Sequence, residues 1–305
     1  MSSRLDGGTA GLTLAALVAF AANSILTRMA LGAGLLDAAS FTTIRLCSGA
    51  LVLALLAARQ LGNPAAWRGR SLTGPVALFA YAAPFSFAYL RIGAAVGALV
   101  LFGVVQLTMI SWGLRKGERP GVQAWGGLIL AAGGLVALTV PSVTRPDLTG
   151  VALMAVAGVA WGVYSIAGTG GSDPLASTAR NFMLSVPLAL LLSLTQLGNA
   201  HGTATGVTLA VISGAVTSGL GYAIWYRALR HLAVTQAGMV QLSVPVIAAL
   251  GAVVFLGESL STRLLLSGVA VLGGIALVLS SRSTDDDPPM KTMKIHDDAD
   301  GPRPF

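Results

Sequence analysis

The chain has 305 residues, of which 54% are hydrophobic and only 10% charged, and its mean hydropathy is +0.77. Soluble domains carry roughly 25% charged residues, so this composition excludes an ordinary soluble domain and indicates an integral membrane protein. The net charge of +7 then reflects basic residues gathered in loops at one membrane face, not a nucleic-acid-binding surface. The single cysteine, Cys47, lies in an apolar run and cannot form an internal disulfide.

Ten apolar runs follow one another along the chain, and each is long enough to cross the bilayer as a helix of roughly 20 residues. A helix is expected because lipid offers no partner to free backbone N–H and C=O groups. The first run is too long for a signal peptide, so we keep it as a span. The expected spans are 9–31, 38–58, 72–91, 94–114, 121–140, 149–168, 176–197, 205–226, 235–256 and 263–281.

The orientation of these spans follows from the basic residues between them. With a cytoplasmic N-terminus, eleven Lys and Arg residues lie at inner ends and loops and four at outer ones. Because Lys and Arg collect in cytoplasmic loops, we expect the N-terminus inside, and ten spans then place the C-terminus inside as well. The polar, proline-containing segment 283–305 is typical of a disordered cytoplasmic tail.

The two halves of the chain resemble one another in sequence. The matching pairs are 103–107 with 238–242, Gly117-Glu118 with Gly257-Glu258, and Gly133-Gly134 with Gly273-Gly274. We therefore expect two repeats, 1–140 and 149–282, of five spans each. An odd number of spans inserts the second repeat upside down, a recurring plan of secondary transporters whose site lies between the copies. The predicted fold is thus an all-α integral membrane protein of ten transmembrane helices in two inverted five-helix repeats.

Charged residues inside the spans are rare. No acidic residue lies at mid-span, so ion coupling through a membrane carboxylate is not expected. Glu118 and Glu258 each open a span, where the carboxylate either faces the positive end of the helix dipole or makes a gating contact. Arg45 either snorkels to the outer surface or lines a wet cavity and attracts a carboxylate. No metal-ligand spacing and no catalytic motif occurs, so we expect no metal, no cofactor and no enzymatic activity.

Aromatic residues make up only 6% of the chain, but they gather at mid-span positions. Tyr81, Phe85 and Tyr89 recur every four residues and so share one helix face. Pro84 interrupts the same turn and weakens its hydrogen bonding. Such side chains either pack helices together or line a cavity, where phenol and indole groups seek polar partners.

Amide side chains at mid-span add polar groups to this pattern. Gln106 and Gln241 occupy equivalent positions of the two repeats, so inversion could place them around one space. Pro245 follows Gln241 and could let its helix bend. An aromatic cavity with a few amides suits a zwitterionic or amphipathic small molecule. The residues expected to bind substrate are Asn23, Tyr81, Phe85, Tyr89, Phe102, Gln106, Trp161, Tyr164, Ser165, Tyr222, Trp225 and Gln241, and the expected hinges are Pro84 and Pro245.

The segment 226–258 resembles the EamA repeat of the drug/metabolite transporter superfamily, and the copy ending at Gly117-Glu118 resembles its first repeat. The residues that carry the resemblance are Ala228-Leu229, Pro245, Leu256-Gly257-Glu258 and Trp161-Gly162, where the first span has Ala22-Asn23 instead. Within the superfamily the chain is most similar to the YddG-type amino-acid exporters of bacterial inner membranes. The resemblance implies ten helices around a central cavity and export of aromatic and other amino acids.

The residue patterns and the family resemblance together predict an inner-membrane exporter of aromatic and other neutral amino acids and related metabolites, working by alternating access without ion coupling. The expected partners are a small-molecule substrate, namely an amino acid, and the lipid bilayer, with no nucleic acid. A monomer would suffice, because ten helices can enclose a pathway. Two alternatives stay open. One is a transporter of the same fold for drugs, sugars or nucleotide-like metabolites, and the other is a membrane receptor or scaffold without transport.

Overall fold

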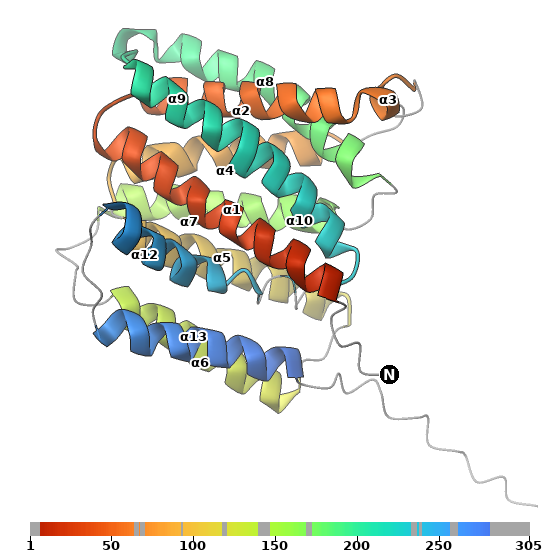
Figure 1. Cartoon of the computed structure of the whole chain (residues 1–305), viewed down its shortest axis with the longest axis vertical. Helices are drawn as coiled ribbons and strands as arrows, with labels where there is room; N and C mark the ends of the chain where they lie inside the picture. Colours follow the sequence, from red (N-terminus) through yellow and green to blue (C-terminus); the bar gives the residue numbers. More distant parts are fainter. Residues whose placement is uncertain are drawn as a thin grey trace, which may run out of the picture.

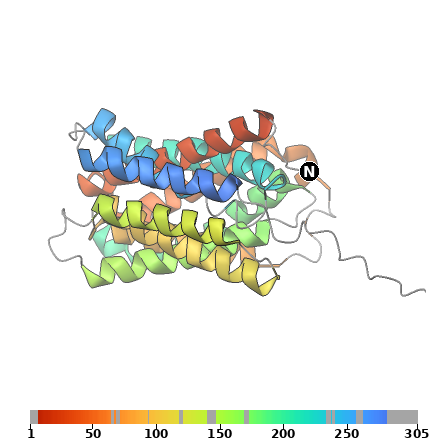
Figure 2. The same ribbon diagram turned by 90° about the horizontal axis from the view of Figure 1, so that it is seen from below.

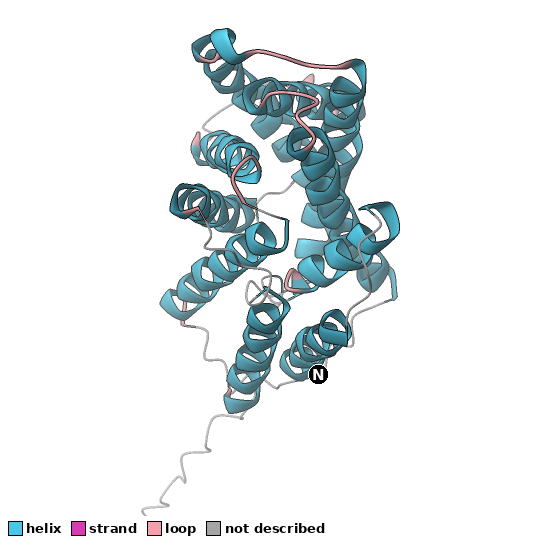
Figure 3. Ribbon diagram, turned by 90° about the vertical axis from the view of Figure 1, so that its left-hand side faces the viewer, coloured by secondary structure: helices cyan, strands magenta, loops and turns pink. Residues whose placement is uncertain are grey.

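A computed structural model of the chain describes residues 7–63, 67, 71–92, 94–117, 121–139, 147–168, 173–232, 237, 240–256 and 262–280. Within these ranges the regular structure is helical (Figure 3), and the β-type pairing is one isolated bridge between Leu36 and Gly202. The helices lie side by side with their long axes roughly along one direction (Figures 1 and 2). This arrangement confirms the expected all-helical fold.

The described helices follow the apolar runs of the sequence. In the first half they are α1 (Gly7–Gly32), α2 (Ala38–Leu56), α3 (Ala58–Leu61), α4 (Thr73–Tyr89), α5 (Ala94–Arg115) and α6 (Val122–Thr139). In the second half they are α7 (Leu148–Gly168), α8 (Pro174–Thr195), the 3₁₀ turn η3 (Leu197–Asn199), α9 (Ala204–Ile212), the π-helix η4 (Ser213–Leu220), α10 (Gly221–Leu229), α12 (Ser243–Leu256) and α13 (Thr262–Ser280). A described helix overlaps each range expected as a span.

Five of the described elements are long and apolar enough to cross a membrane. They are Gly7–Gly32, Ala38–Leu56, Leu148–Gly168, Pro174–Thr195 and the continuous run Ala204–Leu229. The count of ten crossings and the inverted arrangement of two repeats stay predictions. The expected tail 283–305 and both expected dipole-facing carboxylates, Glu118 and Glu258, lie outside the described residues.

Polar residues between the apolar runs start the helices. Asp37 caps α2 by accepting a hydrogen bond from the Ser40 backbone N–H at 2.9 Å, and Asp173 caps α8 in the same way. Asp147 accepts a hydrogen bond from the backbone N–H of Gly150, in the first turn of α7, at 2.8 Å. Such caps satisfy N–H groups that have no partner within the helix. The acidic residues in the described ranges therefore have local roles at helix starts, outside the membrane interior.

Aromatic side chains fill the centre of the molecule. The fully buried large residues include Trp225, Tyr89, Tyr164, Tyr222 and Phe85. Around them α4 packs against α7, while α2 packs against α8 and η4. Leu and Val side chains on the outer helix faces are widely exposed, as expected where lipid is the solvent. The helices α6 and α13 pack on one another at one end of the stack (Figure 1).

Candidate functional site

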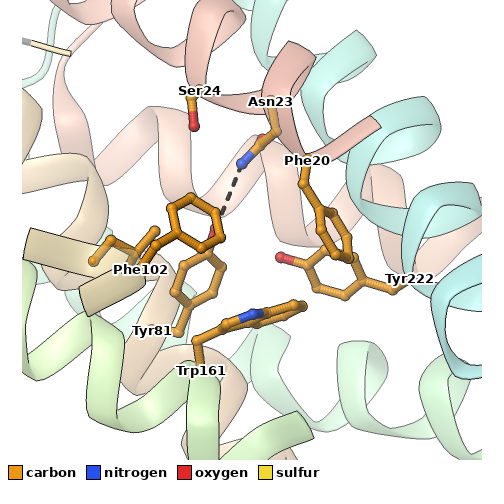
Figure 4. Close-up of a pocket in the computed structure, with 8 residues that line it drawn as sticks. Phe20, Asn23, Ser24, Tyr81, Phe102, Trp161 and Tyr222 are labelled. Carbon is orange, nitrogen blue, oxygen red and sulfur yellow. Dashed lines mark hydrogen bonds between the residues drawn. The ribbon is translucent and has the colours of Figure 1, made fainter. Parts of the chain in front are cut away.

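Five helices contribute to a small pocket at the aromatic centre (Figure 4). Its lining residues are Phe20, Asn23 and Ser24 of α1, Tyr81 of α4, Leu101 and Phe102 of α5, Trp161 of α7 and Tyr222 of α10. The free space at its centre has a volume of ≈ 10 Å³, room for about one water molecule. A larger molecule can occupy the pocket only if some of these side chains or helices move apart.

Trp161 is the central ring of the pocket. Its ring centroid lies 5.3 Å from that of Phe20, 5.1 Å from that of Tyr81 and 4.8 Å from that of Tyr222. The Phe20 ring meets Trp161 edge-on, and the two tyrosine rings are tilted against it. Tilted and edge-on contacts are favourable for aromatic pairs. The ring faces therefore provide an apolar wall from four different helices.

Amide side chains place polar groups at the ends of this wall. Gln241 accepts a hydrogen bond from the indole Nε1–H of Trp161 at 2.6 Å. The Oδ1 atom of Asn23 accepts hydrogen bonds from Ser213 at 2.7 Å and from Thr217 at 3.4 Å. Asn23 also donates a long hydrogen bond of 3.5 Å to the hydroxyl of Tyr81 (Figure 4). These contacts satisfy buried polar groups that would otherwise be costly in an apolar environment.

Gln106 is an exception to this pattern. It is only 4% exposed, and neither Nε2 nor Oε1 of its amide has a hydrogen-bond partner. An unpaired buried amide costs roughly 2–7 kcal/mol, depending on the reference state. Phe102, one helical turn earlier on α5, lines the pocket. Gln106 therefore holds unused donor and acceptor capacity beside the site.

Arg45 lies behind two of the pocket walls. Its side chain is 1% exposed, so it does not snorkel to the surface, and that interpretation of the sequence is wrong. Its Nε–H donates to Ser218 at 2.8 Å, and its Nη2–H group donates to the hydroxyls of Tyr222 at 3.0 Å and Tyr81 at 3.3 Å. The guanidinium carbon also lies 5.2 Å from the centroid of the Tyr81 ring, within the range of a cation–π contact.

The π-helix η4 carries three of the hydroxyl groups that reach this centre, those of Ser213, Thr217 and Ser218. π-helical turns are rare and occur frequently at functional sites. The segment is rich in small residues, which lets it approach α2 closely. A Cβ atom added at Gly214 would collide with the backbone oxygen of Arg45 and with Ser48. The tight contact positions η4 so that its hydroxyls face α1 and α2.

The structure brings many of the residues expected to bind substrate to this centre. Asn23, Tyr81, Phe102, Trp161 and Tyr222 line the pocket. The others lie outside the lining and are buried, namely Phe85, Tyr89, Gln106, Tyr164, Ser165, Trp225 and Gln241. Ring contacts link this second set to the first, for example Tyr81 with Phe85 at 5.2 Å between centroids. Contact of either set with a substrate stays a prediction.

The expected hinges occupy different kinds of position. Pro84 lies inside α4, which continues through it from Thr73 to Tyr89. Pro245 is the third residue of α12, directly after a turn at Gln241 and Leu242. Proline fits the first turn of a helix, because its missing N–H has no helical partner there. Bending at either proline stays a prediction.

Sequence reasoning missed several residues of the site. Phe20, Ser24 and Leu101 line the pocket, and Ser213, Thr217 and Ser218 supply hydroxyls to its polar network. Phe20 and Ser24 lie three residues before and one after Asn23, so their place on the same part of α1 was available from helical spacing. No comparable signal identified the small hydroxyl residues of η4, because short stretches of Ser, Thr and Gly are common in membrane helices.

Comparison with known proteins adds a family and several relatives. The model of the EamA-like transporter family matches residues 148–280. An uncharacterized protein of Pseudomonas aeruginosa is 49% identical over 281 residues, covering 91% of this chain and 96% of that protein. The threonine/homoserine exporter RhtA of Escherichia coli is 27% identical over 260 residues, covering 81% and 84%. A solved crystal structure superposes with a TM-score of 0.73 at 20% identity, covering 88% of this chain and 97% of the other.

Proposed function

This chain belongs to the EamA-like transporter family, and from this premise we propose that it exports amino acids across a bacterial inner membrane. Family membership and the long apolar helices make it a multi-pass membrane protein. Within this class, the proposed substrates are aromatic and other neutral amino acids and related metabolites, as in the YddG-type exporters. The similarity to RhtA, whose name gives threonine and homoserine as its substrates, supports amino acids as the substrate class.

The single observation that carries the proposal is the combination of ring faces and amides at the buried pocket. Phe20, Tyr81, Trp161 and Tyr222 provide apolar surface, and Asn23 provides a hydrogen-bonding group beside it. Ligand sites are commonly apolar cavities with a few well-placed polar groups. An amino acid has one apolar side chain and one polar end, so it matches this division.

The proposed mechanism is alternating access between two inverted repeats, 1–140 and 149–282, with both termini in the cytoplasm. A free volume of ≈ 10 Å³ is too small for an amino acid, so the pocket has to open to one side and then to the other. Pro84, Pro245 and the π-helix η4 are the points at which the helices would bend. Asn23, Gln106 and Gln241 would orient the polar end of the substrate.

Transport is proposed to be facilitative and to need no partner subunit. The acidic residues of the described ranges, Asp37, Asp147 and Asp173, lie at helix starts, which supports movement down the substrate gradient without a carboxylate that carries a coupling ion. One chain would provide the whole pathway. The bilayer and the substrate would then be its only required partners, with no role for nucleic acid, cofactor or metal.

Flux measurements in proteoliposomes test this function. Purified protein is reconstituted into liposomes, and the liposomes are loaded with the amino acids of a panel. Counterflow of the labelled amino acids is then followed with and without a pH gradient. We expect at least one neutral amino acid to move, with little change when the pH gradient is imposed. Movement of no panel member by folded, monodisperse protein would contradict the proposal and favour a receptor or scaffold.

A matched pair of tryptophan variants tests the location of the site. Trp161→Phe removes the hydrogen bond to Gln241, and we expect it to lower the affinity for the transported amino acid by about two- to tenfold, since a buried hydrogen bond contributes roughly 0.5–1.5 kcal/mol. Trp125→Phe is the control, because Trp125 lies on α6 and is 41% exposed. Equal flux through both variants would remove Trp161 from the site.

A further inference from the structure

The guanidinium of Arg45 is a buried cation without a counter-ion among the described residues. The salt bridge between Arg91 and Asp147 lies at the surface and does not involve Arg45. Along its own helix, the nearest acidic residue is Asp37, eight positions earlier and about 12 Å away at 1.5 Å per residue. Removing a charge from water carries a large penalty unless an opposite charge or strong hydrogen bonds compensate it.

The hydrogen bonds of Arg45 leave part of its donor capacity unused. Nε and Nη2 donate to the neutral hydroxyls of Ser218, Tyr81 and Tyr222, and Nη1 is buried without any partner. A guanidinium has five N–H donors in a planar fork, whose geometry matches the two oxygens of a carboxylate. The unpaired Nη1 and the lack of a counter-ion among the described residues therefore both point to an anion supplied by a bound molecule.

The route from the pocket to this cation is short. Tyr81 and Tyr222 accept hydrogen bonds from Nη2 and also line the pocket, so their phenols separate the guanidinium from the free space. Arg45 donates to the hydroxyl of Tyr81 at 3.3 Å and to that of Tyr222 at 3.0 Å, and Asn23 adds only a long hydrogen bond of 3.5 Å to Tyr81. Rotation of either phenol would bring an entering carboxylate within reach of Nη1 and Nη2.

We propose that Arg45 binds the carboxylate of the transported molecule after Tyr81 or Tyr222 moves aside, so that the site selects small monocarboxylates such as amino acids over their amides and amines. The inference rests on the proposed function and names the recognition element of the same pocket. The charged hydrogen bonds formed in this way replace hydrogen bonds to neutral hydroxyls, and the substrate supplies the counter-ion that the helices lack. The ring faces of the pocket then hold the side chain of the substrate.

Binding measurements on purified wild-type protein give the first test. Quenching of tryptophan fluorescence is titrated with L-phenylalanine and with L-phenylalaninamide, which differ only at the carboxyl group. We expect the acid to bind about 10- to 100-fold more tightly, which is the range that corresponds to a charged hydrogen bond of roughly 1.5–3 kcal/mol. Equal affinities for the acid and the amide would overturn the proposal, and so would an absence of binding by both.

Variants of Arg45 give the second test. In Arg45→Gln the preference for the acid should fall to within about threefold, while the amide binds as in wild type, because only the charged hydrogen bonds to the carboxylate are lost. Arg45→Lys should restore part of the preference, because it keeps the charge without the fork. Arg91→Gln, which changes a surface arginine paired with Asp147, is the matched control and should keep the full preference.

The outcomes separate this inference from the proposed function. Transport of amino acids with equal transport of their amides would overturn the role of Arg45 and leave export standing. Selective binding of the acid without transport would support the carboxylate site and contradict export. A full preference retained in Arg45→Gln would overturn the inference. If Arg45→Gln does not fold, the comparison of acid and amide on wild type still decides.

Discussion

Two close helix contacts, α2 against η4 in the centre and α6 against α13 at one end of the stack, show how the same packing device serves different purposes. In both, glycine brings two backbones together. A Cβ atom at Gly214 would collide with Arg45 and Ser48, and one at Gly274 would lie 2.8 Å from the backbone nitrogen of Ala131. In lipid no hydrophobic force drives helices together, so their association depends on close van der Waals packing. Small residues at the contact allow the backbones to approach closely enough for that packing.

The surroundings of the two contacts differ. The contact between α2 and η4 encloses Arg45 and the hydroxyl of Ser218. On α6 and α13 large apolar side chains point outward, such as Ile129 at 70% exposure and Val269 at 71%. Lipid accommodates apolar side chains without cost, whereas buried polar groups have to be compensated. The polar contact therefore belongs to the candidate functional site, and the apolar contact lies at the edge of the stack.

The largest expected effect is at the central contact. Gly214→Ala places a methyl group against Ser48 and the backbone carbonyl of Arg45, and this carbonyl cannot give way as a flexible side chain can. We therefore expect it to destabilise the protein by about 3 kcal/mol, the upper end of the usual range for overpacking. Thermal unfolding in detergent measures the loss. The control is Gly133→Ala on α6, where a Cβ meets nothing within 4 Å, and melting should be unchanged or slightly raised. Equal melting of Gly214→Ala and wild type would remove the distinction between centre and edge.

A smaller effect is expected at the edge. Gly274→Ala forces α13 away from Ala131 and the carbonyl of Gly127, but both helices lie at the end of the stack with exposed outer faces and can separate slightly. We therefore expect a loss of about 1 kcal/mol, near the lower end of the overpacking range, with the transport rate retained. Gly273→Ala, one residue earlier with open space around it, is the matched control for thermal unfolding. A loss as large as that of Gly214→Ala would show that the edge is as constrained as the centre.

The smallest expected effect concerns Asp37, which lies between α1 and α2 and caps α2. Partial burial opposes the charge of Asp37, but the Ser40 and His201 backbone N–H groups outweigh it and hold the pKa of this carboxyl below its ordinary value of 3.8. A depressed pKa stabilises the folded state at pH values above 3.8, and this stabilisation is lost as the pH falls through the folded-state pKa. The cap joins the α1–α2 loop to the loop before α9.

Asp37→Asn tests this linkage by thermal unfolding between pH 7 and pH 3. At pH 7 the variant should be less stable by about 1 kcal/mol or less, because Asn also caps helices well. The difference from wild type should shrink as the pH falls below 3.8, where Asp37 itself becomes protonated. A difference that stays constant down to pH 3 would show that the charge of Asp37 contributes nothing to folding.

Local patterns predicted the helices and part of the site. The apolar runs matched the described helices to within a few residues, except that α12 begins at Ser243 and not at the expected residue 235. The spacing of Tyr81, Phe85 and Tyr89 placed them on one buried face. The interior position of Arg45 could not be predicted, because one arginine near the end of an apolar run is compatible with snorkelling and with burial. The π-helix η4 could not be predicted either, since its register depends on how α2 and α1 pack against it.

The sequence by itself determined that this protein is helical and resides in a membrane. Long apolar runs with few charges can satisfy their backbone hydrogen bonds in lipid only as helices, and that requirement acts within each run. Tertiary structure alone decided which polar atoms meet. Asn23, Arg45 and Ser218 come from three separate helical elements, and their meeting depends on the rotation and approach of each helix against its neighbours. The rotation and approach of a helix are set by how its side chains interdigitate with those of neighbouring helices. The periodicity of one helix carries no information about that packing.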